Sequence, residues 1–146
     1  MSKAVAVAVA LSMMVSLPTM IEDRSEHELM LNIVALESWH VYGYEGYLAV
    51  ASVIMNRVEV ERFPDSVEGV ISQPGQFSTY TSTREPYVTT EARRAVLDAL
   101  NGKRNLPKDI LFFCTVEAYN RSSFFQSLEV YKIEHGHVWC SYPKEG

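Results

Sequence analysis

The chain has 146 residues, of which 47% are apolar and 21% are charged. This balance is typical of one compact globular domain with its own hydrophobic core. The net charge is −5, the sequence pI is about 5.3, and no basic stripe runs along the chain. We therefore do not expect a nucleic-acid partner.

The N-terminal segment has a composition of its own. Lys3 precedes an uncharged run of Ala, Val, Leu, Ser and Met from residue 4 to residue 15. A short basic start and a short apolar run resemble a secretory signal peptide, and the run is too short to span a bilayer comfortably. We expect residues 1–24 to be a signal-like segment and connector that directs export, and residues 25–146 to be the folded domain. The alternative is an N-terminal helix that packs on the domain.

Two helices are expected next. Ser25, with Glu28 three residues later, forms a capping-box pattern and predicts a helix over residues 26–39. Gly43 interrupts the pattern. The second helix, expected over residues 45–61, is apolar nearly all round, which is typical of a helix in the middle of a core.

Further helices are separated by a long polar segment. Ser66 is placed to cap a short helix over residues 67–71, and Thr89 or Thr90 to cap a longer one that ends at the Asn-Gly pair after residue 100. Residues 73–87 lack periodicity and begin with a Pro-Gly turn signal. We expect a surface loop there, of a length that is often functional in a small domain.

The C-terminal third predicts strands. Residues 110–115, 129–133 and 137–142 are rich in β-formers, and the last two flank Glu134-His135-Gly136 as a hairpin would. Residues 120–127 are expected to be irregular. Because helices precede strands, the predicted class is α+β, with a small antiparallel sheet toward the C-terminus.

Glu37 lies on the apolar stripe of the first predicted helix, in line with Met30 and Ile33. Burial there would raise the pKa of the carboxyl, as a general acid near neutral pH requires. The alternative is a helix-end carboxylate that reaches water or pairs with an arginine. Most glycosidases use a second carboxylate, but none of the other candidates lies on an apolar stripe, and a one-carboxylate mechanism is the more natural hypothesis. Those candidates are Glu45, Asp65, Glu85, Glu91 and Glu117.

A His and Cys group near the C-terminus offers a weaker signal. The spacing of His135, His137 and Cys140 invites a zinc interpretation, but no supporting Cys-x-x-Cys or His-Glu-x-x-His pattern accompanies it. A nucleophilic dyad of Cys114 and His137 is also conceivable. The two cysteines could pair if the protein is exported, but we favour buried thiols in core strands.

Aromatic residues gather just after Glu37. Trp39, His40, Tyr42 and Tyr44 could close the hydrophobic core as an aromatic cluster. Alternatively, they form a sugar-contacting rim beside Glu37.

Several blocks together resemble the SleB-like cell-wall hydrolase domain, the spore-cortex-lytic, hydrolase family 2 group. Besides Glu37, they are Tyr44-Glu45-Gly46, Ala49 to Val58, Phe63-Pro64, Ser66-Val67, Val70-Ile71, Gln73 to Ser78 and Gly136 to Trp139. The resemblance covers roughly Leu29 to Tyr142. Its most specific elements are the Ala-Val-Ala…Asn-Arg-Val block and the Gln-Pro-Gly-Gln-Phe-Ser block at this separation.

The resemblance implies a single lysozyme-like α+β domain that cleaves the MurNAc–GlcNAc linkage of peptidoglycan, usually as a lytic transglycosylase. The single catalytic glutamate of the family corresponds to Glu37. No metal or cofactor is implied; the partner is the peptidoglycan glycan strand, the place is the cell wall or the extracellular space, and we expect a monomer. The substrate contacts expected beside Glu37 are Gln76, Ser78, Tyr80, Trp39 and His137.

The chain departs from the family pattern directly after Glu37. Ser38-Trp39-His40 stand where the family usually has Ala and a small or basic residue, and the loop to Glu45-Gly46 is about one residue longer. These departures concern substrate preference and activity, not the fold. They support one alternative, a non-catalytic wall-binding module on the same fold.

Overall fold

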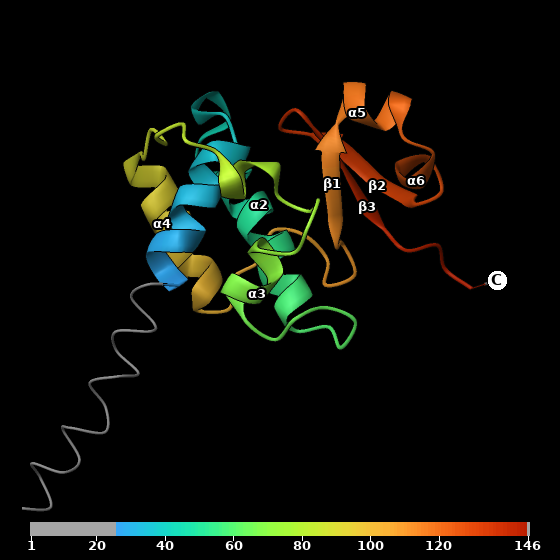
Figure 1. Ribbon diagram of the computed structural model, residues 1–146, viewed down its shortest axis with the longest axis horizontal. Helices are drawn as coiled ribbons and strands as arrows, with labels where there is room; N and C mark the ends of the chain where they lie inside the picture. The colour runs from blue at the N-terminus through green and yellow to red at the C-terminus, as the bar shows by residue number, and fades with distance from the viewer. Residues whose placement is uncertain (1–25, 146) are drawn as a thin grey trace, which may run out of the picture.

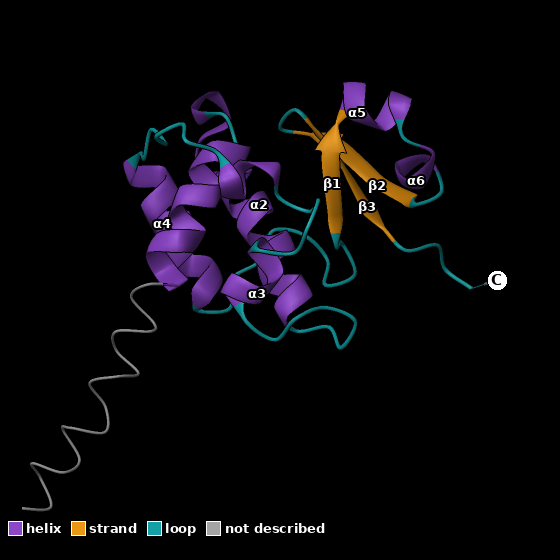
Figure 2. Ribbon diagram, in the orientation of Figure 1, coloured by secondary structure: helices purple, strands orange, loops and turns teal. Residues whose placement is uncertain are grey.

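A helical half and a sheet half face each other in the structure, a computed structural model that describes residues 26–145 (Figures 1 and 2). The signal-like segment, the Ser25 cap and the boundary at residue 24 lie outside the described residues. Helices come first and a small antiparallel sheet follows, which confirms the predicted α+β class. Among the described residues, no helix combines the length and apolarity needed to cross a membrane.

The helical half is built around α2 (Gly43–Val58), whose side chains are buried on nearly all sides, as predicted. The first helix covers residues 26–37 and ends two residues earlier than expected, before a short 3-10 turn. The other elements are η1 (His40–Tyr42), α3 (Val67–Ile71), η2 (Ser78–Thr81) and α4 (Thr90–Leu100).

Two predicted caps hold short helices in place. The Ser66 hydroxyl accepts a hydrogen bond from the N–H of Gly69 at the start of α3, and the Thr89 hydroxyl accepts one from the N–H of Ala92 at the start of α4. Each satisfies a backbone donor that has no partner within its own helix.

The sheet has the order β1-β3-β2, from β1 (Phe112–Thr115), β2 (Glu129–Glu134) and β3 (His137–Ser141). A two-residue turn joins β2 to β3, with φ of 54° at His135 and 76° at Gly136. Two positive φ values are typical of the type I′ turn that matches the twist of a hairpin. The predicted hairpin is therefore confirmed.

The expectation of an irregular segment after β1 was wrong. The chain forms α5 (Val116–Arg121) and α6 (Ser123–Gln126) instead. The hydroxyls of Thr115 and Ser122 accept hydrogen bonds from backbone N–H groups at the start of these helices, and such caps stabilise helices too short for a periodic pattern.

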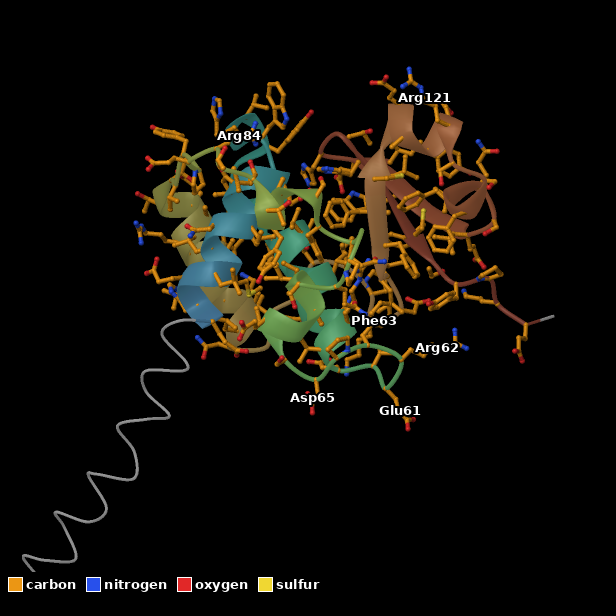
Figure 3. The ribbon with its side chains drawn as sticks, in the orientation of Figure 1. Glu61, Arg62, Phe63, Asp65, Arg84 and Arg121 are labelled. Atoms are coloured by element: carbon orange, nitrogen blue, oxygen red, sulfur yellow. The ribbon has the colours of Figure 1, made fainter. Side chains whose placement is uncertain are left out.

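Two polar residues late in α2 connect the helical half to the chain that enters β1. The side-chain amide of Asn56 donates to the carbonyls of Pro107 (2.9 Å) and Ile110 (3.0 Å), and Nε of Arg57 donates to the carbonyl of Leu111 (2.7 Å). Phe63 packs against the apolar clusters of both halves and lies near the seam between them (Figure 3). These contacts fix the helical half against the sheet.

Candidate active site in a cleft between the helices and the sheet

A cleft of about 400 Å³ runs between the two halves. The C-terminal end of the first helix contributes Glu37, the loop after α3 contributes Gln76, the start of η2 contributes Ser78, and β3 contributes His137. Apolar and small residues of β1, α5 and α6 form the opposite wall. A mostly apolar concavity with a few convergent polar groups is typical of a ligand site.

Glu37 is the acidic side chain that lines this cleft. It is half-buried, and its Oε1 accepts a hydrogen bond of 2.5 Å from the Thr79 hydroxyl. Burial raises the pKa of the Glu37 carboxyl above its ordinary value, and this effect outweighs the hydrogen bonds from Thr79 and the positive charge of Arg84, which lower it. The side chain is therefore suited to carry a proton at a pH where an exposed glutamate has lost it.

Glu37 is the only carboxylate that lines this cleft among residues 26–145. The five other candidates lie elsewhere; Glu45 accepts a hydrogen bond from Asn105, for example, and Glu117 pairs with Arg121 at 2.9 Å. Figure 3 shows Arg121 at the outer end of α5. A reaction that needs two enzyme carboxylates therefore has no second group here.

His137 lines the cleft, and one of its two ring nitrogens is held by a backbone hydrogen bond. Its Nδ1 lies 3.1 Å from the carbonyl oxygen of His135, and because a carbonyl only accepts, Nδ1 carries the hydrogen. Burial lowers the pKa of His137, so the ring is neutral near pH 7 and its Nε2 is left as an acceptor. Edge-on packing against Phe113 and Trp139, at centroid distances of 5.0 and 5.3 Å, holds the ring in place.

Arg57 lines the same cleft from the helical side and is almost fully buried. Its guanidinium lies over the rings of Phe63, Phe77 and Phe112, at 5.0 to 5.4 Å. Burial lowers the pKa of Arg57 to about 10, because the cation has left water without a carboxylate beside it. Arg57 joins the two walls of the cleft.

The structure brings together some of the expected substrate contacts and separates others. Gln76, Ser78 and His137 line the cleft with Glu37. Tyr80 lies in η2 and does not line it, and Trp39 lies outside it with 72% of its surface exposed. The core-closing interpretation of Trp39 was therefore wrong.

The cysteine and metal alternatives gain no support from the geometry. Cys114 and Cys140 are free and buried, as favoured, and burial raises the pKa of the Cys114 thiol to about 11, which makes it a poor nucleophile. As expected, His135 lies in the hairpin turn, and it is therefore not in a strand beside His137. Among residues 26–145, no group of three or more His, Cys, Asp or Glu is placed to hold a metal.

Two contacts that shape the cleft, those of Arg57 and Thr79, were not predictable from the sequence. Arg57 was visible only as a polar interruption of an apolar helix, and nothing local predicts three aromatic rings around it. Thr79 lies in the segment expected to be a surface loop, and nothing local indicates that its hydroxyl, rather than that of Ser78 or Thr81, bonds to Glu37. Both depend on contacts between residues far apart in the chain.

Comparison with known proteins identifies the family. A family model described as Cell Wall Hydrolase matches residues 42–140, beginning five residues after Glu37. The spore cortex-lytic enzyme of Halalkalibacterium halodurans is 46% identical over 80 residues, 49% of this chain and 24% of that protein. That of Bacillus subtilis is 42% identical over 80 residues, 49% of this chain and 26% of that protein. The chain thus spans about a quarter of the length of these curated relatives.

Solved structures extend the likeness over the domain. The crystal structure of the catalytic domain of the Bacillus cereus SleB protein matches with a TM-score of 0.69 and 31% identity, over 81% of this chain and 91% of that one. The catalytic domain of a germination-specific lytic transglycosylase, SleB from Bacillus anthracis, matches with a TM-score of 0.68 and 31% identity, over 80% and 93%. The expected lysozyme-like fold and the SleB-like resemblance are confirmed, and the chain belongs to the cell wall hydrolase family.

Proposed function

We propose that this domain cleaves the MurNAc–GlcNAc linkage of peptidoglycan glycan strands as a lytic transglycosylase, with Glu37 as its single acid and base. The observation that carries the proposal is a lone carboxylate with a raised pKa in the cleft between the helical half and the sheet half. The related domains described as spore cortex-lytic enzymes and as a lytic transglycosylase support the substrate and the reaction type.

The reaction follows from what one carboxyl group can do. Protonated Glu37 donates its proton to the glycosidic oxygen as the bond to the muramyl C1 breaks, and the GlcNAc side leaves with that proton. The Glu37 carboxylate then takes the proton of the C6 hydroxyl of the same muramyl ring. The C6 oxygen bonds to C1, which closes a 1,6-anhydro ring and restores the acid. Because the substrate supplies the nucleophile, the reaction needs no second enzyme carboxylate and consumes no water.

The neighbours of Glu37 have separate tasks in this proposal. The Thr79 hydroxyl stabilises the ionised carboxylate between the two steps. Gln76 and Ser78 offer polar groups to the sugar, and Nε2 of His137 accepts a hydrogen bond from a sugar hydroxyl or amide. We further propose that the domain acts as an exported monomer and needs no metal or cofactor.

Digestion of purified peptidoglycan tests the assignment of Glu37. Glu37→Gln keeps the size and the acceptor for Thr79 but removes the proton donor, and we expect the release of soluble fragments to fall by at least about a thousandfold. Glu91→Gln is the matched control, because Glu91 is an exposed carboxylate in the first turn of α4; it should retain activity. Substantial cleavage by Glu37→Gln would overturn the assignment. Binding of insoluble peptidoglycan by wild type without any release would indicate a wall-binding module instead.

A further inference from the structure

A second cavity, of about 320 Å³, is lined in part by the helix end that carries Glu37 and by the residues directly after it. Its lining includes Ser38, Trp39 and His40 from the residues after the first helix, and Arg84, Glu85 and Tyr87 from the loop before α4. None of these residues lines the Glu37 cleft. We refer to this set of six as the aromatic cavity.

The aromatic cavity holds the two most exposed aromatic side chains of the described residues. Trp39 is 72% exposed and Tyr87 is 76% exposed. The ring of His40 meets that of Tyr87 edge-on at a centroid distance of 6.2 Å. Large exposed rings that converge on one concavity from separate segments mark a binding surface rather than a core.

The polar groups of the cavity fit a neutral ligand rich in hydroxyl and amide groups. Arg84 and Glu85 contribute one positive and one negative charge, so the pair does not select an anion. The Ser38 hydroxyl is buried against Gly46, so the polar groups open to a ligand are those of the exposed residues His40, Arg84, Glu85 and Tyr87. Sugar rings combine apolar C–H faces for aromatic side chains with hydroxyls for such groups.

The aromatic cavity adjoins the Glu37 cleft through shared structure. Ser38 and Glu37 are consecutive residues, and each lines one of the two hollows. Arg84 lines the cavity, donates a hydrogen bond of 3.2 Å to the carbonyl of Leu36, and acts electrostatically on Glu37. Figure 3 shows Arg84 at the top of the helical half, above the first helix.

From this geometry we infer that the aromatic cavity is a second sugar-binding site, which holds a stretch of the same glycan strand beyond the bond presented to Glu37. The inference rests on the proposed function for the identity of the strand. It assigns Trp39 and Tyr87 as the stacking platform. The unusual Ser38-Trp39-His40 sequence then serves to hold the strand rather than to change the chemistry.

Fluorescence quenching tests the inference without any turnover. The chain has two tryptophans; Trp139 is fully buried and Trp39 is exposed, so acrylamide quenching reports on Trp39. In the Glu37→Gln background, peptide-free MurNAc–GlcNAc strands should reduce the quenching constant at least about twofold. Adding Tyr87→Ala should weaken the binding of the strands about tenfold. Tyr131→Ala is the matched control, since Tyr131 is a half-exposed ring on β2 outside both hollows; it should leave binding unchanged.

The outcomes separate this inference from the proposed function when wild-type digestion is measured alongside. Fragment release by wild type, with quenching of Trp39 unaffected by the strands, would overturn the second site and leave the proposed function standing. Protection of Trp39 from acrylamide in a protein that releases no fragments would support the second sugar-binding site and overturn the proposed enzymatic function. Protection by a free muramyl peptide but not by peptide-free strands would overturn the assignment to sugar.

Discussion

The hydrogen bond from Thr79 favours the ionised form of the Glu37 carboxyl and opposes the larger effect of burial. Thr79→Val replaces the hydroxyl with a methyl group of nearly the same size and removes a donor that favours the ionised form. A hydrogen bond to a charged group contributes about 1.5–3 kcal/mol, and the lower end applies because Glu37 is only partly buried. About 1.4 kcal/mol corresponds to a tenfold change in the ratio of protonated to ionised carboxyl.

The assay is the pH dependence of kcat/KM for peptidoglycan cleavage. In the proposed mechanism the protonated form of Glu37 starts the reaction, so activity should fall on the alkaline side as this proton is lost. We expect Thr79→Val to move that alkaline limb to higher pH, with up to about tenfold more relative activity at a fixed pH on the limb. Thr79→Ser keeps the donor and should keep the limb. An alkaline limb that stays in place, or moves to lower pH, in Thr79→Val would show that this hydrogen bond does not lower the pKa of the catalytic group.

Three further predictions concern stability and thiol chemistry. Burial raises the folded-state pKa of Glu37 above its ordinary 4.5, so the folded protein loses stability as pH rises from 4.5 through the raised pKa. Glu37→Gln should therefore raise the urea midpoint near neutral pH and match wild type near pH 4. Equal midpoints of variant and wild type at both pH values would contradict this. Arg57→Met leaves the Leu111 carbonyl without its hydrogen-bond donor, which costs about 1–3 kcal/mol of stability. The same change removes a buried cation, and its lowered pKa of about 10 corresponds to a burial cost of about 3 kcal/mol. By urea titration, the free energy of unfolding of Arg57→Met should lie within about 1.5 kcal/mol of wild type. That of Arg57→Ala, which also opens a cavity, should lie about 3–4 kcal/mol below wild type. A Met variant as unstable as the Ala variant would show that the cation itself stabilises the seam between the two halves. Cys114 and Cys140 should label slowly in the folded protein and fully in urea, because burial raises the pKa of both thiols; fast labelling with loss of cleavage would revive the cysteine hypothesis.

Local signals predicted the parts of the fold that local chemistry determines. The apolar α2, the Ser66 and Thr89 caps and the hairpin at His135-Gly136 each depend on a few neighbouring residues. The helices after β1 were missed because four to six residues carry too little periodicity. The local signal that could have revealed them is the pair of capping residues, Thr115 and Ser122.

The site shows the same division between local and distant information. The position of Glu37 on an apolar stripe could be read from helical spacing. Its partner Thr79 is 42 residues away, and the contact of Arg57 with Leu111 spans 54 residues. Trp39 was placed beside Glu37 by its sequence position, but the helix ends at residue 37 and the turn that follows carries the indole into the other cavity. Only the folded chain distinguishes the two sides of that helix end.

In the proposed mechanism, one carboxyl group performs the whole reaction with a nucleophile taken from the substrate. The most direct measurement is mass spectrometry of the fragments released by wild type in water enriched in the heavy oxygen isotope. We expect muramyl ends that carry no isotope and lack one water relative to a reducing end, as a 1,6-anhydro ring requires. Reducing ends labelled with one heavy oxygen atom would contradict it, because they would show that water attacks the bond and that a second group must activate it.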